Sequence, residues 1–314
     1  MQKPDISVIV ATYNVQAYIE RAVRSALDQQ GVIVEIIVID DNSTDDTVGV
    51  ASRINDPRIK ILRRVTNGGP SAARNEGLAI ASAPWIAILD GDDSLAEGRL
   101  QRCLRHAHAM QADIVVDNLQ VCREADGATF PMFSAAKLGR KPLLDLSHFI
   151  GGNLLMFSTS SLGYVKPIFS REFLLRHHLK YDLELRIGED YMLLLEALAC
   201  GARCAVEPTA GYRYTMRASS ISHRLALADI LHMKASDQRF LSRHKLDHAA
   251  QRAQRLRTFT LEEVFHFTRL VDALKQKQMM DAVKIVLRRP TSALHLWNPI
   301  WVRLKKLMPR GSRR

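Results

Sequence analysis

The chain has 314 residues, 47% of them hydrophobic, and a formal net charge of +11 at pH 7. This length allows one large domain with an appendage, or two modest domains. No apolar run approaches the roughly 18–20 residues that cross a bilayer, and the N-terminal residues lack the pattern of a signal peptide. Four cysteines without a Cys-x-x-Cys spacing predict reduced thiols in a cytosolic protein.

The positive charge is concentrated at the C-terminal end. Residues 282–314 contain nine Lys or Arg and no Asp or Glu, which leaves 35 bases and 33 acids in residues 1–281. The first 281 residues are therefore nearly neutral, which argues against a basic groove for nucleic acid. The basic isoelectric point therefore arises from residues 282–314 and not from the rest of the chain.

Short apolar runs alternate with helical patterns through the first half of the chain. Buried strands are predicted at residues 7–11, 36–39, 59–62, 85–89 and 114–116. Helices are predicted over 19–27, from a capping box at Ser43–Asp46 to Ile54, over 70–81 with Pro70 in the first turn, and after Ala96. This alternation predicts βαβ units and a parallel sheet.

Three carboxylates, Asp90, Asp92 and Asp93, follow directly after the apolar run 86–89. Ligands bind beyond the carboxyl ends of strands in open α/β sheets, and clustered carboxylates suit Mg²⁺ or Mn²⁺. The alternative is a solvated Asp-Gly turn. Neither a Gly-x-Gly-x-x-Gly after the first strand nor a Walker-type loop is present. A nucleotide held partly through a metal is therefore expected.

The second half of the sequence is less regular. Residues 120–185 are expected to form loops that shape an acceptor pocket, with a helix over 170–177. Glu189 and Asp190 open a further helix that ends at Gly201. Simple capping is the alternative reading of these two acids, because the helix macrodipole favours acids at its N-terminus. Residues 225–290 predict two or three amphipathic helices without chemistry of their own.

Five blocks together resemble the family 2 glycosyltransferases, whose fold is called GT-A. They occur in the family's order and spacing, at residues 7–14, 37–45, 67–75, 90–93 and 188–190. The resemblance implies an α/β fold with a Rossmann-like, mostly parallel sheet flanked by helices and a C-terminal helical extension. The catalytic domain would span residues 1–225 and the extension residues 226–314. Within the family, the chain is most similar to bacterial exopolysaccharide enzymes of the succinoglycan type.

The resemblance also implies roles for residues at the nucleotide end. Thr12, Tyr13 and Asp41 would form a uracil site, in which the Asp41 carboxylate accepts the imide N–H of the base. Asp40 belongs to the same set, and could instead support the loop. Arg74 is placed to reach the nucleotide or its diphosphate, because a guanidinium matches phosphate oxygens; the alternative is a surface arginine.

At the reacting end, Asp90 and Asp92 resemble the family's Asp-x-Asp pair and would bind Mn²⁺ or Mg²⁺. Asp92 is the expected direct ligand, with Asp90 nearer the ribose or a metal-bound water. Asp190 is the expected general base that removes the acceptor proton, with Glu189 second. His223 could approach the diphosphate or the metal, or could be structural.

The implied activity is metal-dependent, inverting transfer of a hexose, with glucose as first choice, from a UDP-sugar. The implied acceptor is a polyprenyl-diphosphate-linked glycan in surface polysaccharide synthesis. The alternatives are a nucleotidyltransferase acting on sugar phosphates and a non-catalytic carbohydrate-binding relative.

The basic tail also predicts a location for the protein. Trp297, Trp301 and nine bases within residues 282–314 predict binding to an anionic membrane surface. The expected location is cytoplasmic, peripheral on the inner face of the plasma membrane. The alternative is a disordered, solvated tail.

Overall fold

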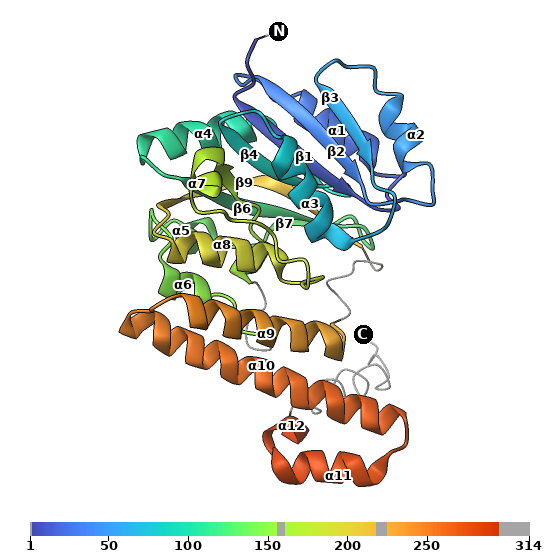
Figure 1. The fold of residues 1–314 in the computed structure, drawn as a ribbon, viewed down its shortest axis with the longest axis vertical. Helices are drawn as coiled ribbons and strands as arrows, with labels where there is room; N and C mark the ends of the chain where they lie inside the picture. Colours follow the sequence, from blue (N-terminus) through green and yellow to red (C-terminus); the bar gives the residue numbers. More distant parts are fainter. Residues whose placement is uncertain (1, 156–160, 218–224, 295–314) are drawn as a thin grey trace, which may run out of the picture.

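A computed structural model describes residues 2–155, 161–217 and 225–294 of the chain. One sheet runs through the molecule in the strand order β3-β2-β1-β4-β8-β6-β9-β5, with β7 paired to β6 (Figure 1). The strands are β1 Ile6–Thr12, β2 Val34–Asp40, β3 Ile59–Arg63, β4 Trp85–Asp90, β5 Ser94–Leu95, β6 Ile114–Arg123, β7 Thr129–Pro131, β8 Ile168–Ser170 and β9 Cys204–Met216.

The half of the sheet made by β3, β2, β1 and β4 is parallel throughout. Its helices are α1 Ile19–Leu27, α2 Thr47–Ser52 and α3 Gly69–Ile80. In Figure 1, α1 and α2 lie behind these strands and α3 lies in front. Because helices cover both faces, every residue of β2 is buried, which explains the unbroken apolar runs in the sequence. The predicted strands and the parallel arrangement are confirmed here.

The other half of the sheet is mixed. Strand β8 pairs antiparallel with both β4 and β6, whereas β6 and β9 are parallel. The remaining elements of this half are α4 Arg99–Ala109, α5 Ala135–Leu138, α6 Leu146–Gly151, a 3₁₀ turn at Leu162–Tyr164, α7 Arg171–Arg176 and α8 Glu189–Ala199. The expectation of loops over residues 120–185 is therefore wrong in part. Strands of three residues are too short to show an alternating pattern.

The predicted capping box at residues 43–46 is also wrong. Helix α2 begins only at Thr47, and no side chain caps its first turn. The Ser43 hydroxyl instead donates to Asp40 Oδ1 over 2.5 Å, and Asp45 accepts from Thr47 and from the backbone amide of Gln16. These side chains join the loops after β1 and β2. In contrast, Pro70 lies in the first turn of α3, as predicted.

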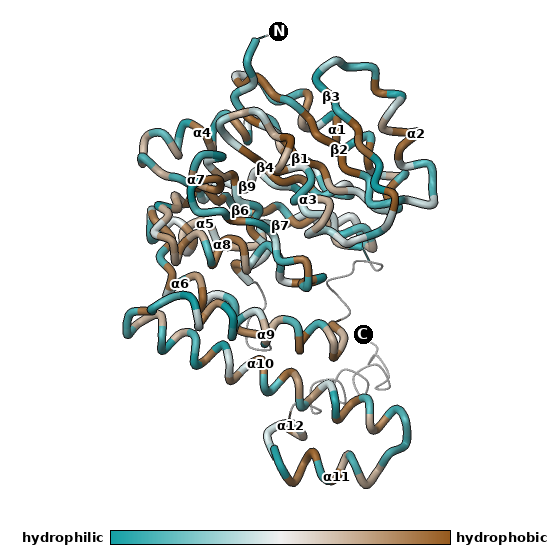
Figure 2. Tube along the Cα trace, viewed as in Figure 1, coloured by the Kyte–Doolittle hydropathy of each residue, from teal (hydrophilic) through white to brown (hydrophobic). Residues whose placement is uncertain are grey.

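The C-terminal region consists of the helices α9 Leu227–Arg243, α10 His248–Lys275, α11 Met279–Arg288 and α12 Thr291–Leu294. Helix α10 packs against α6, and Arg257 of α10 donates to the Asn153 carbonyl oxygen over 2.9 Å. Figure 2 shows apolar residues where these helices meet the rest of the molecule. Residues 282–288 and 291–294 are helical, so the first part of the predicted tail is folded. No helix in the described ranges is long and apolar enough to span a membrane.

Candidate active site

The loops that follow the parallel strands meet at one edge of the sheet. In the strand register Thr12 lies opposite Asp40, and Ala11 lies opposite Asp90. The predicted acids of β2 and β4 therefore flank the end of β1, as expected for a ligand site in an open α/β sheet.

The Asp41 carboxylate binds the loop before α3. It accepts from Arg64 Nη1 at 2.5 Å, and from the backbone amides of Gly68 at 2.9 Å and Gly69 at 2.7 Å. Gly69 has a φ of +80°, which favours glycine at this turn. A carboxylate has about four acceptor positions, so one remains for a ligand N–H. The role of Asp41 in uracil binding stays a prediction.

The other residues of the predicted nucleotide site differ in exposure. The Asp40 carboxylate is fully buried and accepts from the backbone amide of Ser43 at 3.0 Å as well as from its hydroxyl, which fits the loop-supporting alternative. Thr12 is buried, and its hydroxyl lies 3.4 Å from the Ile39 carbonyl oxygen. The Tyr13 side chain is 46% exposed and is therefore the accessible member of the set.

A buried ion-pair cluster lies at the centre of the site. Arg74 donates to Asp90 Oδ1 and Glu189 Oε1, each at 2.6 Å, and lies 3.2 Å from Asp190 Oδ1. Lys166 Nζ lies 2.7 Å from Asp90 Oδ2 and 2.5 Å from Asp190 Oδ2. The acids of β4 and α8 are therefore joined by two shared cations. The alternative of a surface arginine is wrong for Arg74, which is 3% exposed.

Sequence reasoning missed Lys166, which is only 7% exposed. It occupies a segment of otherwise apolar and small residues just before β8. A lysine in such a segment is a usable signal, because lysine is almost never fully buried unless it is paired.

A second cation, Arg217, was also missed. It forms an ion pair with Asp92, and its guanidinium lies 4.9 Å from the centre of the Tyr18 ring. Asp93 is held by the protein itself, because it accepts from the Tyr212 hydroxyl and the Thr215 backbone amide, each at 2.7 Å. These carboxylates are not a solvated turn.

The acids of this site have shifted pKa values. Burial raises the pKa of Asp92, and the charge of Asp90 raises it further. Burial also raises the pKa of Asp93 and of Glu189. For Asp90, burial acts in the same direction, but Lys166 and Arg74 outweigh it and hold the pKa well below its usual range.

Carboxylates outnumber cations among the described residues of the site. Five carboxylates lie beside four cations; the acids are Asp90, Asp92, Asp93, Glu189 and Asp190, and the cations are Arg74, Lys166, Arg217 and Arg21, which donates to the Asp92 carbonyl oxygen at 2.7 Å. This surplus of acid fits a divalent cation. Among the described residues no group of three or more His, Cys, Asp or Glu could hold a metal by itself. Asp90 and Asp92 would therefore share the ion with substrate phosphates, as is usual for Mg²⁺. His223 lies outside the described residues.

Glu189 and Asp190 open α8 as predicted, but their side chains do not cap it. The N-cap residue is Gly188, with a φ of +89° and no side-chain cap. The Glu189 carboxylate binds Arg74, and the Asp190 carboxylate binds Lys166. Simple capping therefore does not account for these acids.

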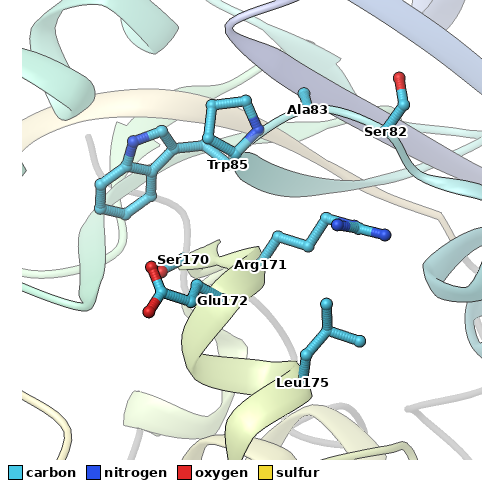
Figure 3. Close-up of a pocket in the computed structure, with 8 residues that line it drawn as sticks. Ser82, Ala83, Trp85, Ser170, Arg171, Glu172 and Leu175 are labelled. Carbon is cyan, nitrogen blue, oxygen red and sulfur yellow. The ribbon is translucent and has the colours of Figure 1, made fainter.

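The pocket in Figure 3 lies at the other end of β4. Its lining residues are Ser82, Ala83, Pro84, Trp85, Ser170, Arg171, Glu172 and Leu175. Trp85 begins β4 and Asp90 ends it, and a strand of this length spans roughly 17 Å. This pocket is therefore separate from the cluster of acids.

Comparison with known proteins identifies the family. The model of glycosyl transferase family 2 matches residues 7–172. The chain is 46% identical to the succinoglycan biosynthesis protein ExoO of Rhizobium meliloti, over 98% of this chain and 88% of that protein. It is 40% identical to a GalNAc(5)-diNAcBac-PP-undecaprenol beta-1,3-glucosyltransferase of Campylobacter jejuni, over 35% of this chain and 37% of that protein. The chain belongs to glycosyl transferase family 2.

Solved structures establish the fold. Staphylococcus aureus TarS in complex with UDP-GlcNAc matches with a TM-score of 0.67 and 21% identity, covering 90% of this chain and 79% of that one. The mannosyltransferase PcManGT of Pyrobaculum calidifontis, in complex with GDP-Man and Mn²⁺, matches with a TM-score of 0.61 and 15% identity, covering 93% and 83%. The predicted GT-A fold is confirmed.

Proposed function

We propose that the protein is an inverting hexosyltransferase of exopolysaccharide synthesis that uses a UDP-sugar, with glucose as first choice. The proposed acceptor is a polyprenyl-diphosphate-linked glycan. The similarity to a succinoglycan biosynthesis protein supports the process, and the similarity to an undecaprenol-linked glucosyltransferase supports the acceptor. The observation that carries the proposal is the joining of Asp90 on β4 to Asp190 on α8 through Lys166.

The donor would bind across the ends of β1, β2 and β4. Tyr13 and Asp41 lie at the proposed nucleoside end, and Asp90 and Asp92 at the proposed diphosphate end. A UDP-sugar complex of a protein with this fold supports the choice of uracil.

Asp92 and Asp90 would hold Mn²⁺ or Mg²⁺, with Asp92 the direct ligand. When bound, the ion supplies Lewis-acid neutralisation of the leaving diphosphate. The acid surplus of the site supports this proposal, as does the Mn²⁺ complex of PcManGT.

Asp190 would act as the general base toward the acceptor hydroxyl. Lys166 holds Asp190 Oδ2 at 2.5 Å, while Oδ1 is buried, makes no hydrogen bond and lies 3.2 Å from Arg74 Nη1. Oδ1 is therefore the oxygen with lone pairs available for the acceptor proton. Glu189 is less suited, because Arg74 donates to its Oε1 at the shorter distance of 2.6 Å. A single base without a protein nucleophile fits inversion of the anomeric configuration.

Calorimetric titration of UDP tests the donor site. We expect Mn²⁺ or Mg²⁺ to strengthen UDP binding in the wild type, because the cation attracts the diphosphate. Asp92→Ala should remove most of that gain, because it removes the proposed direct ligand of the metal. Equal affinity in all of these conditions would remove the metal from the mechanism. The same titration with GDP and other nucleotides tests the choice of uracil, and a transfer assay with UDP-glucose tests the sugar.

We also propose that the basic C-terminal region brings the enzyme to the cytoplasmic face of the membrane. Helices α11 and α12 include residues up to 294, so a truncation that keeps every described helix ends at Leu294. Residues 295–314 lie outside the described part. They contain Trp297, Trp301 and six bases. A chain that ends at Leu294 should bind anionic vesicles more weakly and still bind UDP.

A further inference from the structure

Helix α11 is held to the rest of the molecule by one narrow face. Its residues Ala282 and Ile285 are buried against Leu270 and Ala273 of α10. Figure 1 places α11 at the end of the molecule that lies farthest from the parallel strands. Successive residues of a helix are about 100° apart around its axis, so Ala282 and Ile285 occupy only one side of α11. Much of the circumference of α11 therefore remains open to a partner.

That open part is apolar. Four side chains form what we call the α11 stripe: Met279 is 61% exposed, Met280 75%, Val283 53% and Leu287 76%. Their spacing places them within about 100° of one another on the helix. Figure 2 shows apolar residues along α11, at the end of the molecule opposite the parallel strands. A helix with one apolar face in the core normally presents polar residues on the other, so the stripe is unusual in that no residue of the described ranges covers it.

Basic residues border the α11 stripe. Lys284 and Arg288 follow it around the helix, and Lys275 and Lys277 lie at the preceding turn. Between residues 273 and 294 there are five bases and one acid, Asp281. Lys284 lies 3.3 Å from Asp281, and Arg289 pairs with Glu263 of α10 at 2.7 Å. The border of the α11 stripe therefore carries a net positive charge.

We infer that α11 lies on the surface of an anionic lipid bilayer. The α11 stripe contacts the boundary of the acyl chains, and Lys284 and Arg288 lie among the headgroups, as in interfacial amphipathic helices. A second copy of the chain fits less well, because it would bring two cationic surfaces together. Residues 295–314 also fit poorly as a cover, since they carry the same sign of charge. The inference rests on the proposed membrane association and adds that helix α11 is an element that contacts the bilayer.

Vesicle sedimentation of the full-length protein tests the α11 stripe. The probe is phosphatidylcholine vesicles with and without phosphatidylglycerol at low salt. We expect wild type to sediment with the anionic vesicles, and Leu287→Glu to reduce the bound fraction about tenfold, because it places a charge at the acyl boundary. Leu175→Glu is the matched control: Leu175 is 55% exposed on α7, and its replacement should leave sedimentation unchanged.

The basic border is tested in the same way. Lys284→Glu with Arg288→Glu should weaken the preference for phosphatidylglycerol, whereas Arg255→Glu, at an exposed position of α10, should not. Each charge near an anionic surface contributes binding that salt weakens, so the wild-type interaction should also fall as salt rises.

Three outcomes would overturn the inference. The first is wild type that does not sediment with anionic vesicles, and the second is Leu287→Glu that sediments as wild type does. The third is a dimer in light scattering that Leu287→Glu dissociates, which would assign the stripe to a second copy. UDP titration of the same variants separates this inference from the proposed function. Failure of UDP to bind wild type would count against the enzyme proposal, whatever the vesicles show.

Discussion

Replacing Lys166 with methionine tests whether the central cluster depends on shared cations. Methionine keeps an unbranched apolar chain but removes the ammonium that lies 2.7 Å from Asp90 and 2.5 Å from Asp190. Removing one partner of a buried ion pair costs about 3–5 kcal/mol. Asp90 is 24% exposed and keeps Arg74, so we expect the lower end, about 3 kcal/mol of unfolding free energy at neutral pH.

The pKa of Asp90 determines how the stability difference should change with pH. The pKa of Asp90 lies below its usual value because Lys166 and Arg74 outweigh burial. Its ion pairs therefore stabilise the fold above the pKa of the unfolded chain, about 4, and this contribution is lost as the pH falls further. The difference between wild type and Lys166→Met should accordingly stay nearly constant from pH 7 to about pH 5 and shrink as the pH falls below about 4.

Urea unfolding at several pH values measures this difference, and two further variants act as controls. Lys166→Arg keeps the charge and should recover most of the stability. Lys60→Met removes a lysine that is 54% exposed and paired with the buried Glu35 at 3.0 Å. Glu35 keeps the hydroxyl groups of Ser7 and Ser82 as donors, so we expect a loss of only about 1 kcal/mol. Equal losses in Lys166→Met and Lys60→Met, or a loss that does not vary with pH, would refute the reasoning.

Two further variants test the chemistry and the core. Asp190→Asn should lower the transfer rate by about 10²–10⁴-fold and leave UDP affinity within a few-fold, because a general base acts on the acceptor; an inactive Glu189→Gln with active Asp190→Asn would reverse the assignment. Gly77→Ala should lower the unfolding free energy by about 1–3 kcal/mol through overpacking, because the added Cβ would lie 2.4 Å from Ile9 Cγ2; urea unfolding that matches wild type would contradict this.

The sequence predicts the parallel half of the fold well because its signals are local. Strands β1, β2 and β4 are runs of mostly buried residues, and the acids at the ends of β2 and β4 lie at a position that the topology determines. The capping-box prediction failed for a physical reason. Ser43 and Asp45 bond to Asp40 and to the loop after β1, and such partners, about 30 residues away in the case of Gln16, cannot be read from a local pattern.

The cations of the site were harder to predict than its acids. Lysine and arginine have long side chains, so their head groups reach partners far away in the sequence. Lys166 binds Asp90, and Arg217 binds Asp92, although each pair is separated by more than seventy residues in the chain. A motif of neighbouring acids identifies one side of these pairs, but only the fold identifies the other.

The insertion of β8 is what joins the two sides of the candidate site. By pairing antiparallel with β4, β8 places the preceding segment beside the carboxyl end of that strand, and this segment carries Lys166. The ammonium can then lie between Asp90, which belongs to the parallel half, and Asp190, which begins α8. Without β8 the two acids would keep only Arg74 as a shared cation, and less of their mutual repulsion would be offset. The mixed half of the sheet therefore sets the geometry of the proposed reaction, although the motifs that predict the reaction lie mostly in the parallel half.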